Sequence, residues 1–343
     1  MSVLRDIRAH GTFREPAFVE LGVEHVPFDE LTGAERVERP LLEAVTAGSS
    51  AAVVGVRGGG KSSVLAWLCR HLPADHVPIR VPVVGMDDPS DPAVLGSVAL
   101  GAALDAARAG EMGLEEGQRA ALERARADEV TIQGGGRRVS GKLGGGPVPA
   151  QVSAELGSLA GEYARGAQPA DRLYGLDRLL GVFASHDLIP VFVLEDTEAA
   201  LGAGAERAVR DRFFTASLKL LVREVDTPTV IAVQEHFAAL DAFAELRPSV
   251  LEIAVPRLRE RVEDALRAIL ARRLAPFGLA DGIESILPAA ALPALAAFYE
   301  EKDGSIRHVL AALDVATTAA LDNGDERLEL GHVRLGIEDW RTR

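Results

Sequence analysis

Cysteine is nearly absent from this sequence, because Cys69 is the only one among 343 residues. A single thiol excludes a disulfide framework and any metal site built from several cysteines. Basic side chains are also scarce relative to acidic ones, 37 against 51, and the formal net charge is −14. A chain this acidic does not coat nucleic acid through its overall charge, so any such binding has to come from a local basic patch.

Long hydrophobic runs are missing as well. The most apolar C-terminal run, residues 286–298, is too short to span a bilayer and contains Pro288 and Pro293. The N-terminus shows no secretory signal pattern. We therefore expect a cytoplasmic protein without a membrane segment, and a hydrophobic content of 48% is ample for the core of one large or two ordinary domains.

The most informative stretch is residues 51–67, AAVVGVRGGGKSSVLAW. Its valine-rich first part predicts a buried strand, and its last part has a spacing compatible with a helix. Between them the sequence matches G-x-x-x-x-G-K-[ST], the pattern of a phosphate-binding loop. The residues expected to bind nucleotide are Gly55, Gly58, Gly59, Gly60, Lys61, Ser62 and Ser63.

This glycine loop predicts a site for ATP with Mg²⁺. Glycines leave backbone N–H groups free to point at phosphate oxygens, and the helix that follows adds its positive N-terminal end. Lys61 is expected to reach the β- and γ-phosphates, and Ser62 to place its hydroxyl on Mg²⁺. The alternative is a glycine turn before an ordinary helix, in which Ser63 is only a helix residue. Lys61 and the Ser62 hydroxyl favour the phosphate site, because both stand at the positions that such a site requires.

An apolar run over residues 189–194 ends in Glu195 and Asp196. Parallel sheets bind ligands at the carboxyl ends of their strands, so we expect these acids to serve the metal and the attacking water. The sequence leaves their roles open: Asp196 lies near Mg²⁺ and Glu195 polarises water, or the reverse. Glu198 is a weaker third candidate, and two ordinary acids after a strand are the alternative.

Three further strands are expected, at residues 77–84, 229–233 and 250–255. Two prolines interrupt the first of them, which places it at the edge of the sheet. We expect residues 129–149 to form a glycine-rich, hairpin-like insertion, and a mobile glycine loop is the alternative. The basic side chains of this insertion suit nucleic acid or an acidic partner. Those side chains are Arg137, Arg138 and Lys142. After Pro256 the composition predicts helices alone.

These features resemble AAA+ P-loop ATPases of the origin-recognition and STAND groups. The likeness rests on the glycine loop, on Glu195 and Asp196 at a strand end, and on residues 31–36, LTGAER. The last segment is similar to the family's L-x-G-R-E motif, which in the family packs near the adenine, although Ala34 stands where the family often has arginine. The resemblance covers about residues 28–340, and we expect none of the family's C-terminal winged-helix domain in the residues that remain.

The resemblance implies an α/β P-loop parallel sheet followed by a small all-helical lid. It also implies three site residues. Gln234 takes the sensor 1 position beside the γ-phosphate or the water, and Arg307 the sensor 2 position at the start of a lid helix. Arg247 is the first candidate for an arginine that reaches the nucleotide of the next subunit, ahead of Arg210, Arg212 and Arg223.

We therefore expect an N-terminal arm over residues 1–27, an AAA+ core over 28–256 and a helical lid over 257–343. The expected activity is slow, Mg²⁺-dependent hydrolysis of ATP, coupled to assembly as a homo-oligomer or to a separately encoded protein partner. Two alternatives stay open: a STAND-like ATP switch or scaffold with little turnover, and a DNA-loaded AAA+ regulator or loader.

Overall fold

The structure is a computed structural model. It describes residues 3–14, 18–34, 36–84, 86, 88–109, 169–195, 197, 201, 206–225, 227–279 and 283–342. The expected insertion at 129–149, with its three basic residues, lies outside the described residues, and so do Asp196 and Glu198. The chain divides into two compact units. Unit 1 comprises Met1–Pro40, Val54–Trp67 and Ala254–Arg343, and unit 2 comprises Leu41–Val53 and Leu68–Ile253.

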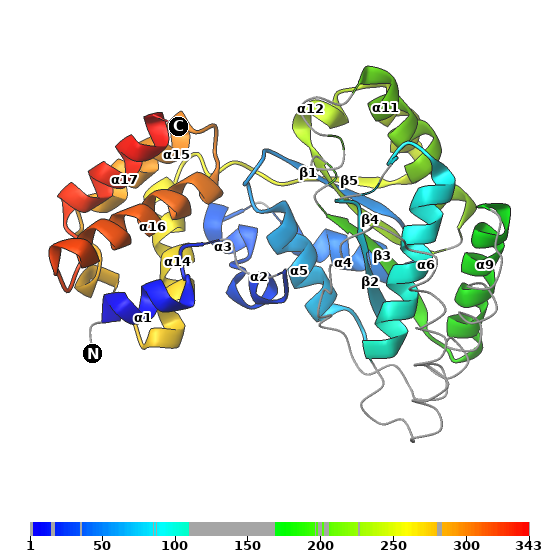
Figure 1. Ribbon diagram of the computed structural model, residues 1–343, viewed down its shortest axis with the longest axis horizontal. Coiled ribbons are helices and arrows are strands. Elements are labelled where there is room, and N and C mark those ends of the chain that lie inside the picture. Colours follow the sequence, from blue (N-terminus) through cyan, green and yellow to red (C-terminus); the bar gives the residue numbers. More distant parts are fainter. Residues whose placement is uncertain are drawn as a thin grey trace. The chain divides into compact units, whose positions relative to one another are not determined.

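A five-stranded parallel sheet of order β2-β3-β4-β1-β5 is built from the apolar runs (Figure 1). Its strands are β1 (Ala51–Gly55), β2 (His76–Pro82), β3 (Ile189–Glu195), β4 (Thr229–Gln234) and β5 (Leu251–Ala254). Every residue of β1 and β4 is buried. Strands covered on both faces need continuous rather than alternating hydrophobicity, which explains the sequence pattern.

The position of β2 at the sheet edge confirms the expectation from its prolines. Proline has no N–H to donate to a second neighbouring strand, so a strand with Pro78 and Pro82 is tolerated only at an edge. β2 pairs in parallel with β3, with Pro82 opposite Glu195, and β3 pairs in parallel with β4. The carboxyl ends of β3 and β4 therefore lie at the same edge of the sheet.

Helices α6 (Pro92–Ala109) and α9 (Pro169–Ser185) pack on each other, α6 against β2 and α9 against β3 (Figure 1). After β3 the chain forms α11 (Arg207–Arg212), which continues into the π-helical segments η1 (Phe213–Leu218) and η2 (Leu220–Glu224). Phe213, Phe214 and Leu221 are fully buried. The short helices α12 (Glu235–Ala238), α13 (Asp241–Leu246) and η3 (Arg247–Ser249) lead from β4 to β5.

The part after β5 is helical, as expected. Its elements are α14 (Val262–Leu274), η4 (Ala275–Phe277), η5 (Ile283–Ser285), α15 (Ala291–Glu301), α16 (Ile306–Asn323) and α17 (Leu330–Thr342). Leu266, Leu295 and Leu313 are buried in its core. The expected domain boundaries stay a prediction, although the one at 256 lies close to Ala254, where the chain passes from unit 2 to unit 1.

The N-terminal residues are part of the packed structure of unit 1. They form α1 (Val3–His10), α2 (Phe18–Glu24) and α3 (Phe28–Thr32). Leu4 and Ile7 are buried, and Arg8 forms an ion pair with Asp314 of α16 at 2.5 Å. Arg273 of α14, only 7% exposed, donates to the carbonyl of Thr12 at 2.8 Å. Across the described ranges, every helix is too short or too polar to cross a membrane.

Candidate functional site

The glycine loop connects β1 to α5 (Lys61–His71), as the sequence predicts. Gly55 ends β1, residues 56–60 form the loop, and Ser62 and Ser63 lie in the first turn of α5. Lys61 is 5% exposed, and its Nζ donates to the carbonyls of Gly55 at 3.2 Å and Val56 at 2.9 Å. Water screens the charge of a buried ammonium only weakly, so Lys61 is placed to attract a phosphate oxygen.

The N-terminus of α16 lies directly on this loop. The carbonyl of Gly58 accepts the backbone N–H groups of Ile306 at 3.0 Å and Arg307 at 3.4 Å. A Cβ built on Gly58 would lie 2.4 Å from Ser305 Oγ and 2.9 Å from Arg307 Cβ. Unit 1 therefore brings the expected sensor arginine and the phosphate-binding loop together, with the positive end of a helix dipole beside them.

Cations gather around this contact. Burial lowers the pKa of His308, and the charges of Lys302, Arg307 and Arg57 lower it further. Within the described part of the chain, the buried Nδ1 of His308 and the buried Oγ of Ser305 have no hydrogen-bond partner. A site with positive charge and unused polar groups is suited to a phosphate oxygen.

Helix α3, which contains the first two residues of the motif at 31–36, contacts the loop through Phe28. Phe28, the first residue of α3, is 2% exposed, and its Cζ would lie 3.3 Å from a Cβ built on Gly60. Any side chain on Gly60 would displace this ring. The motif at residues 31–36 therefore begins inside a short helix whose first residue contacts the loop.

Glu195 has a partner in unit 2 that the sequence did not suggest. It forms an ion pair with Arg80 of β2, and their side chains are 17% and 25% exposed. Thr197, the next described residue, donates through Oγ1 to the carbonyl of Ala232 in β4 at 2.6 Å. The end of β3 is thus fixed to both neighbouring strands, and the charge of Glu195 is balanced by a guanidinium.

Gln234 is the last residue of β4, and Arg247 lies in η3 just before β5, the positions in the chain that the sequence predicts. Gln234 is 8% exposed and immediately precedes α12. Arg247 donates through Nε to Glu252 Oε2 at 2.8 Å and through Nη2 to the carbonyl of Ala238 at 3.1 Å. These bonds hold Arg247 within unit 2, and its role towards another subunit stays a prediction.

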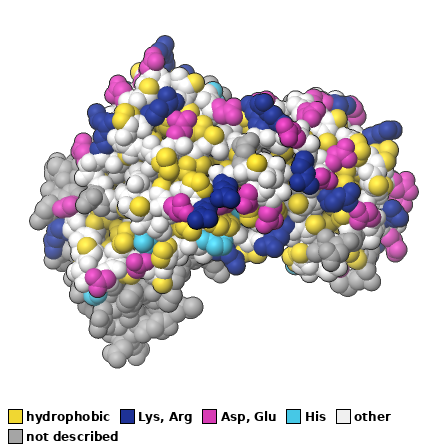
Figure 2. Space-filling view, turned by 180° about the vertical axis from the view of Figure 1, so that it is seen from behind, with side chains coloured by type: hydrophobic (Ala, Val, Ile, Leu, Met, Phe, Trp, Pro, Cys, Tyr) yellow, Lys and Arg dark blue, Asp and Glu magenta, His cyan; other side chains and the backbone are white. Residues whose placement is uncertain are grey.

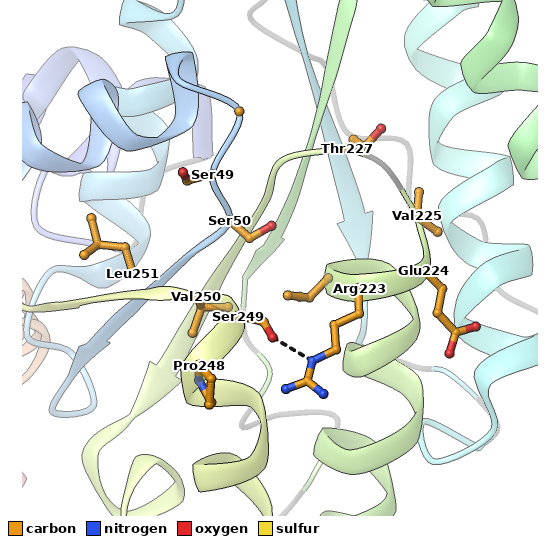
Figure 3. A pocket seen from close by; sticks show the side chains of 12 residues that line it. Ser49, Ser50, Arg223, Glu224, Val225, Thr227, Pro248, Ser249, Val250 and Leu251 are labelled. Carbon is orange, nitrogen blue, oxygen red and sulfur yellow. Dashed lines mark hydrogen bonds between the residues drawn. The ribbon is translucent and has the colours of Figure 1, made fainter.

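A cavity of about 620 Å³ lies elsewhere in unit 2. It is lined by residues that precede β1, β4 and β5, among them Ser50, Thr227 and Ser249. Figure 3 shows Arg223 reaching across it to Ser249, to which Nε donates at 2.6 Å. Ligands of parallel sheets bind at the carboxyl ends of strands, and this cavity is at the amino ends, so we do not assign it to nucleotide.

Sequence reasoning missed Arg80 and Ser305. A charged residue inside an otherwise apolar strand was the available signal for Arg80, and the serine before a helix was the signal for Ser305. Among the described residues, no three His, Cys, Asp or Glu side chains come together as a metal site. The expected Mg²⁺ ligands are one hydroxyl and one carboxylate, Ser62 and Asp196, and the second lies outside the described ranges.

Comparison with protein-family models found no match, and no curated protein sequence matches the chain. Solved structures do match. The Aeropyrum pernix ORC1 protein in complex with DNA is similar over 94% of this chain and 69% of its own, with 18% identity and a TM-score of 0.53. The ORC2 protein of the same organism, in ADPNP and ADP complexes, matches over 88% and 65%, with 14% identity and a TM-score of 0.48. The Cdc6p protein of Pyrobaculum aerophilum matches over 91% and 70%, with 16% identity and a TM-score of 0.45.

Of these three structures, only ORC1 matches with a TM-score above 0.5. Because its sequence identity is low, the match shows that the fold is shared and nothing more. It agrees with the parallel sheet, the glycine loop after β1 and the helices after β5. The chain therefore has the AAA+ fold of the origin-recognition type.

Proposed function

We propose that this chain binds ATP with Mg²⁺ at the glycine loop, hydrolyses it slowly, and couples nucleotide state to assembly or to a protein partner. The observation that carries the proposal is the contact of α16 with Gly58, through the N–H groups of Ile306 and Arg307. It joins a phosphate-binding loop to a helix whose second residue is an arginine.

The residues at the loop fit a triphosphate. Lys61 supplies a buried positive charge, and the glycines at 58 and 60 have φ angles of 73° and 107°, which suit a loop with its amides turned inward. A Cβ on either glycine would meet a neighbouring side chain. Ser62 and Asp196 would hold Mg²⁺, whose charge neutralises phosphate oxygens in phosphoryl transfer.

Arg307 is the residue that would make the helical part respond to nucleotide. A guanidinium binds phosphate oxygens through two parallel N–H groups, and its backbone already contacts the loop. Nucleotide can shift the helices only by its differential affinity for two arrangements. A γ-phosphate bonded to Arg307 would provide that difference between ATP and ADP.

The ion pair of Glu195 with Arg80 supports a smaller catalytic role for Glu195 than for Asp196. We expect Asp196→Asn to lower kcat by about 10²-fold or more, because it removes a charged ligand of the Mg²⁺ that neutralises the phosphate oxygens during transfer. Glu195→Gln should lower it only about threefold to fivefold, because a carboxylate already neutralised by Arg80 adds little to the field at the metal or the water. Phosphate release measures both, and Glu224→Gln, on an exposed glutamate of η2, is the matched control.

A larger loss in Glu195→Gln than in Asp196→Asn would give Glu195 the main role and contradict this division. The wild type also separates the proposal from its first alternative. A chain that binds ATP tightly and shows no turnover above the Lys61→Ala background would be a nucleotide switch or scaffold.

DNA association is a second candidate. A structure similar to this chain was solved in complex with DNA. Figure 2 shows basic and acidic side chains interspersed on the face in view. Because the net charge is −14, we place any DNA site in a local basic group such as Arg137, Arg138 and Lys142. Three phosphate contacts predict an affinity that falls about 40-fold between about 50 and 200 mM salt. Fluorescence anisotropy with duplex DNA measures this, and a triple alanine variant that binds equally well would remove the basic group from consideration.

A further inference from the structure

A buried hydrogen-bonded series joins the N-terminal residues to the first turn of α5. His25 Nδ1 lies 2.7 Å from Ser63 Oγ, and His25 Nε2 lies 2.7 Å from Glu38 Oε1. The same Glu38 oxygen accepts the backbone N–H of Phe28 at 3.0 Å. The side chains of His25 and Glu38 are 2% and 6% exposed. All of these residues belong to unit 1.

The protonation pattern of this series follows from its acceptor. Burial alone would raise the pKa of Glu38, but hydrogen bonds from His25, from its own N–H and from Phe28 N–H lower it. An ionised Glu38 accepts the Nε2–H of His25. In a neutral imidazole Nδ1 then has a lone pair, and the Ser63 hydroxyl donates to it.

The hydrogen bond to His25 thereby holds Ser63 next to the residues expected to bind nucleotide, because Ser63 directly follows Lys61 and Ser62 in the first turn of α5. Contacts further along α5 leave the helix as a whole little freedom to rotate. A Cβ built on Gly22 of α2 would lie 2.7 Å from the carbonyl oxygen of Ala66, so α2 packs on the backbone of α5. The His25 ring lies 6.3 Å from the ring of Trp67.

We propose that His25, oriented by Glu38, is a positioning residue for the nucleotide site, which fixes the rotation of the first turn of α5 through Ser63 and so aims the Ser62 hydroxyl at Mg²⁺. The inference rests on the proposed binding of Mg²⁺-ATP. Because the His25 ring is closed off from solvent, its function is to hold Ser63 and not to exchange protons with a substrate. The N-terminal segment is on this view a part of the metal site.

The test compares the full-length wild type with His25→Gln and Ser63→Ala. Glutamine keeps a polar group towards Glu38 and loses the one towards Ser63, so both variants break the same bond from opposite sides. Titration calorimetry gives Kd for ATP with Mg²⁺ and in EDTA. We expect Kd with Mg²⁺ to rise about 3- to 10-fold in each variant, with little further loss in the double variant, and Kd in EDTA to change less than about twofold. Ser63→Thr, which keeps the hydroxyl, should restore Mg²⁺-dependent binding.

The exposed hydroxyl of Ser185 donates to a carbonyl of its own helix, α9. Ser185→Ala is therefore the control for loss of a serine hydroxyl. Equal losses with and without Mg²⁺, or a Kd within twofold of wild type in both variants, would overturn the inference. If His25→Gln fails to fold, the comparison of Ser63→Ala with Ser63→Thr decides alone. Wild type that binds no ATP would instead refute the proposed function, and Lys61→Ala serves as the binding-deficient reference.

Discussion

Lys61→Ala is expected to lower ATP affinity by about 10²-fold or more. Hydrogen bonds of a charged donor contribute about 1.5–3 kcal/mol each, and tenfold in Kd corresponds to about 1.4 kcal/mol. Lys61 is buried, so its charge acts on phosphate with little screening by water. The substitution also removes the donors to Gly55 and Val56, so a fall in stability of about 1–2 kcal/mol should accompany it.

Calorimetric titration with ATP measures the first effect, and thermal unfolding measures the second. Lys61→Met keeps the aliphatic stem and loses the charge, so it should match alanine in affinity while packing better. Lys219→Ala, on a lysine between η1 and η2, controls for loss of one positive charge elsewhere. Normal ATP binding by either Lys61 variant would refute the site assignment.

Gly58→Ala is expected to weaken ATP binding by about tenfold or more and to loosen α16. Its backbone has a φ of 73°, where a non-glycine residue costs roughly 1–2 kcal/mol. The new methyl would also meet Ser305 Oγ at 2.4 Å and Arg307 Cβ at 2.9 Å. One of the two sides has to move, and either movement separates Arg307 from the loop or distorts the loop itself.

Gly324→Ala is the matched control. Gly324 ends the same helix with a φ of 80°, and a Cβ there meets nothing within 4 Å. It should therefore show the backbone cost of roughly 1–2 kcal/mol in unfolding experiments and no change in Kd for ATP. If both variants bind ATP like the wild type, the contact between α16 and the loop has no part in nucleotide binding. Equal losses of affinity in both would show a general loosening of the helical part.

Local sequence was enough to predict the strands and the glycine loop. A phosphate-binding loop needs only eight consecutive residues between a strand and a helix, so all its requirements appear together in the sequence. The apolar runs predicted buried strands because both faces of a parallel sheet are covered. Pro78 and Pro82 predicted an edge because the missing N–H is a property of the residue itself.

The helices after β5 could also be predicted from the sequence, since the apolar spacing that indicates a helix is a local pattern. The position of Arg307 beside the loop was inferred from the family resemblance and not from spacing, because no local pattern around residue 307 predicts a contact with residue 58. The structure joins them through two backbone hydrogen bonds. Such bonds carry no side-chain signature, so sequence reasoning has no means to detect them.

The sequence by itself determined which groups are available to bind a phosphate: the glycines, Lys61 and the Ser62 hydroxyl, all in one short segment. Only the tertiary structure decided which distant side chains pair with the residues expected to serve the nucleotide. Arg80 balances Glu195 from 115 positions away, and His25 joins Ser63 across 38 positions. The physical reason is that these pairs form through strand order and the close packing of α2 on α5, which depend on the fold as a whole and leave no pattern in any single stretch of the chain.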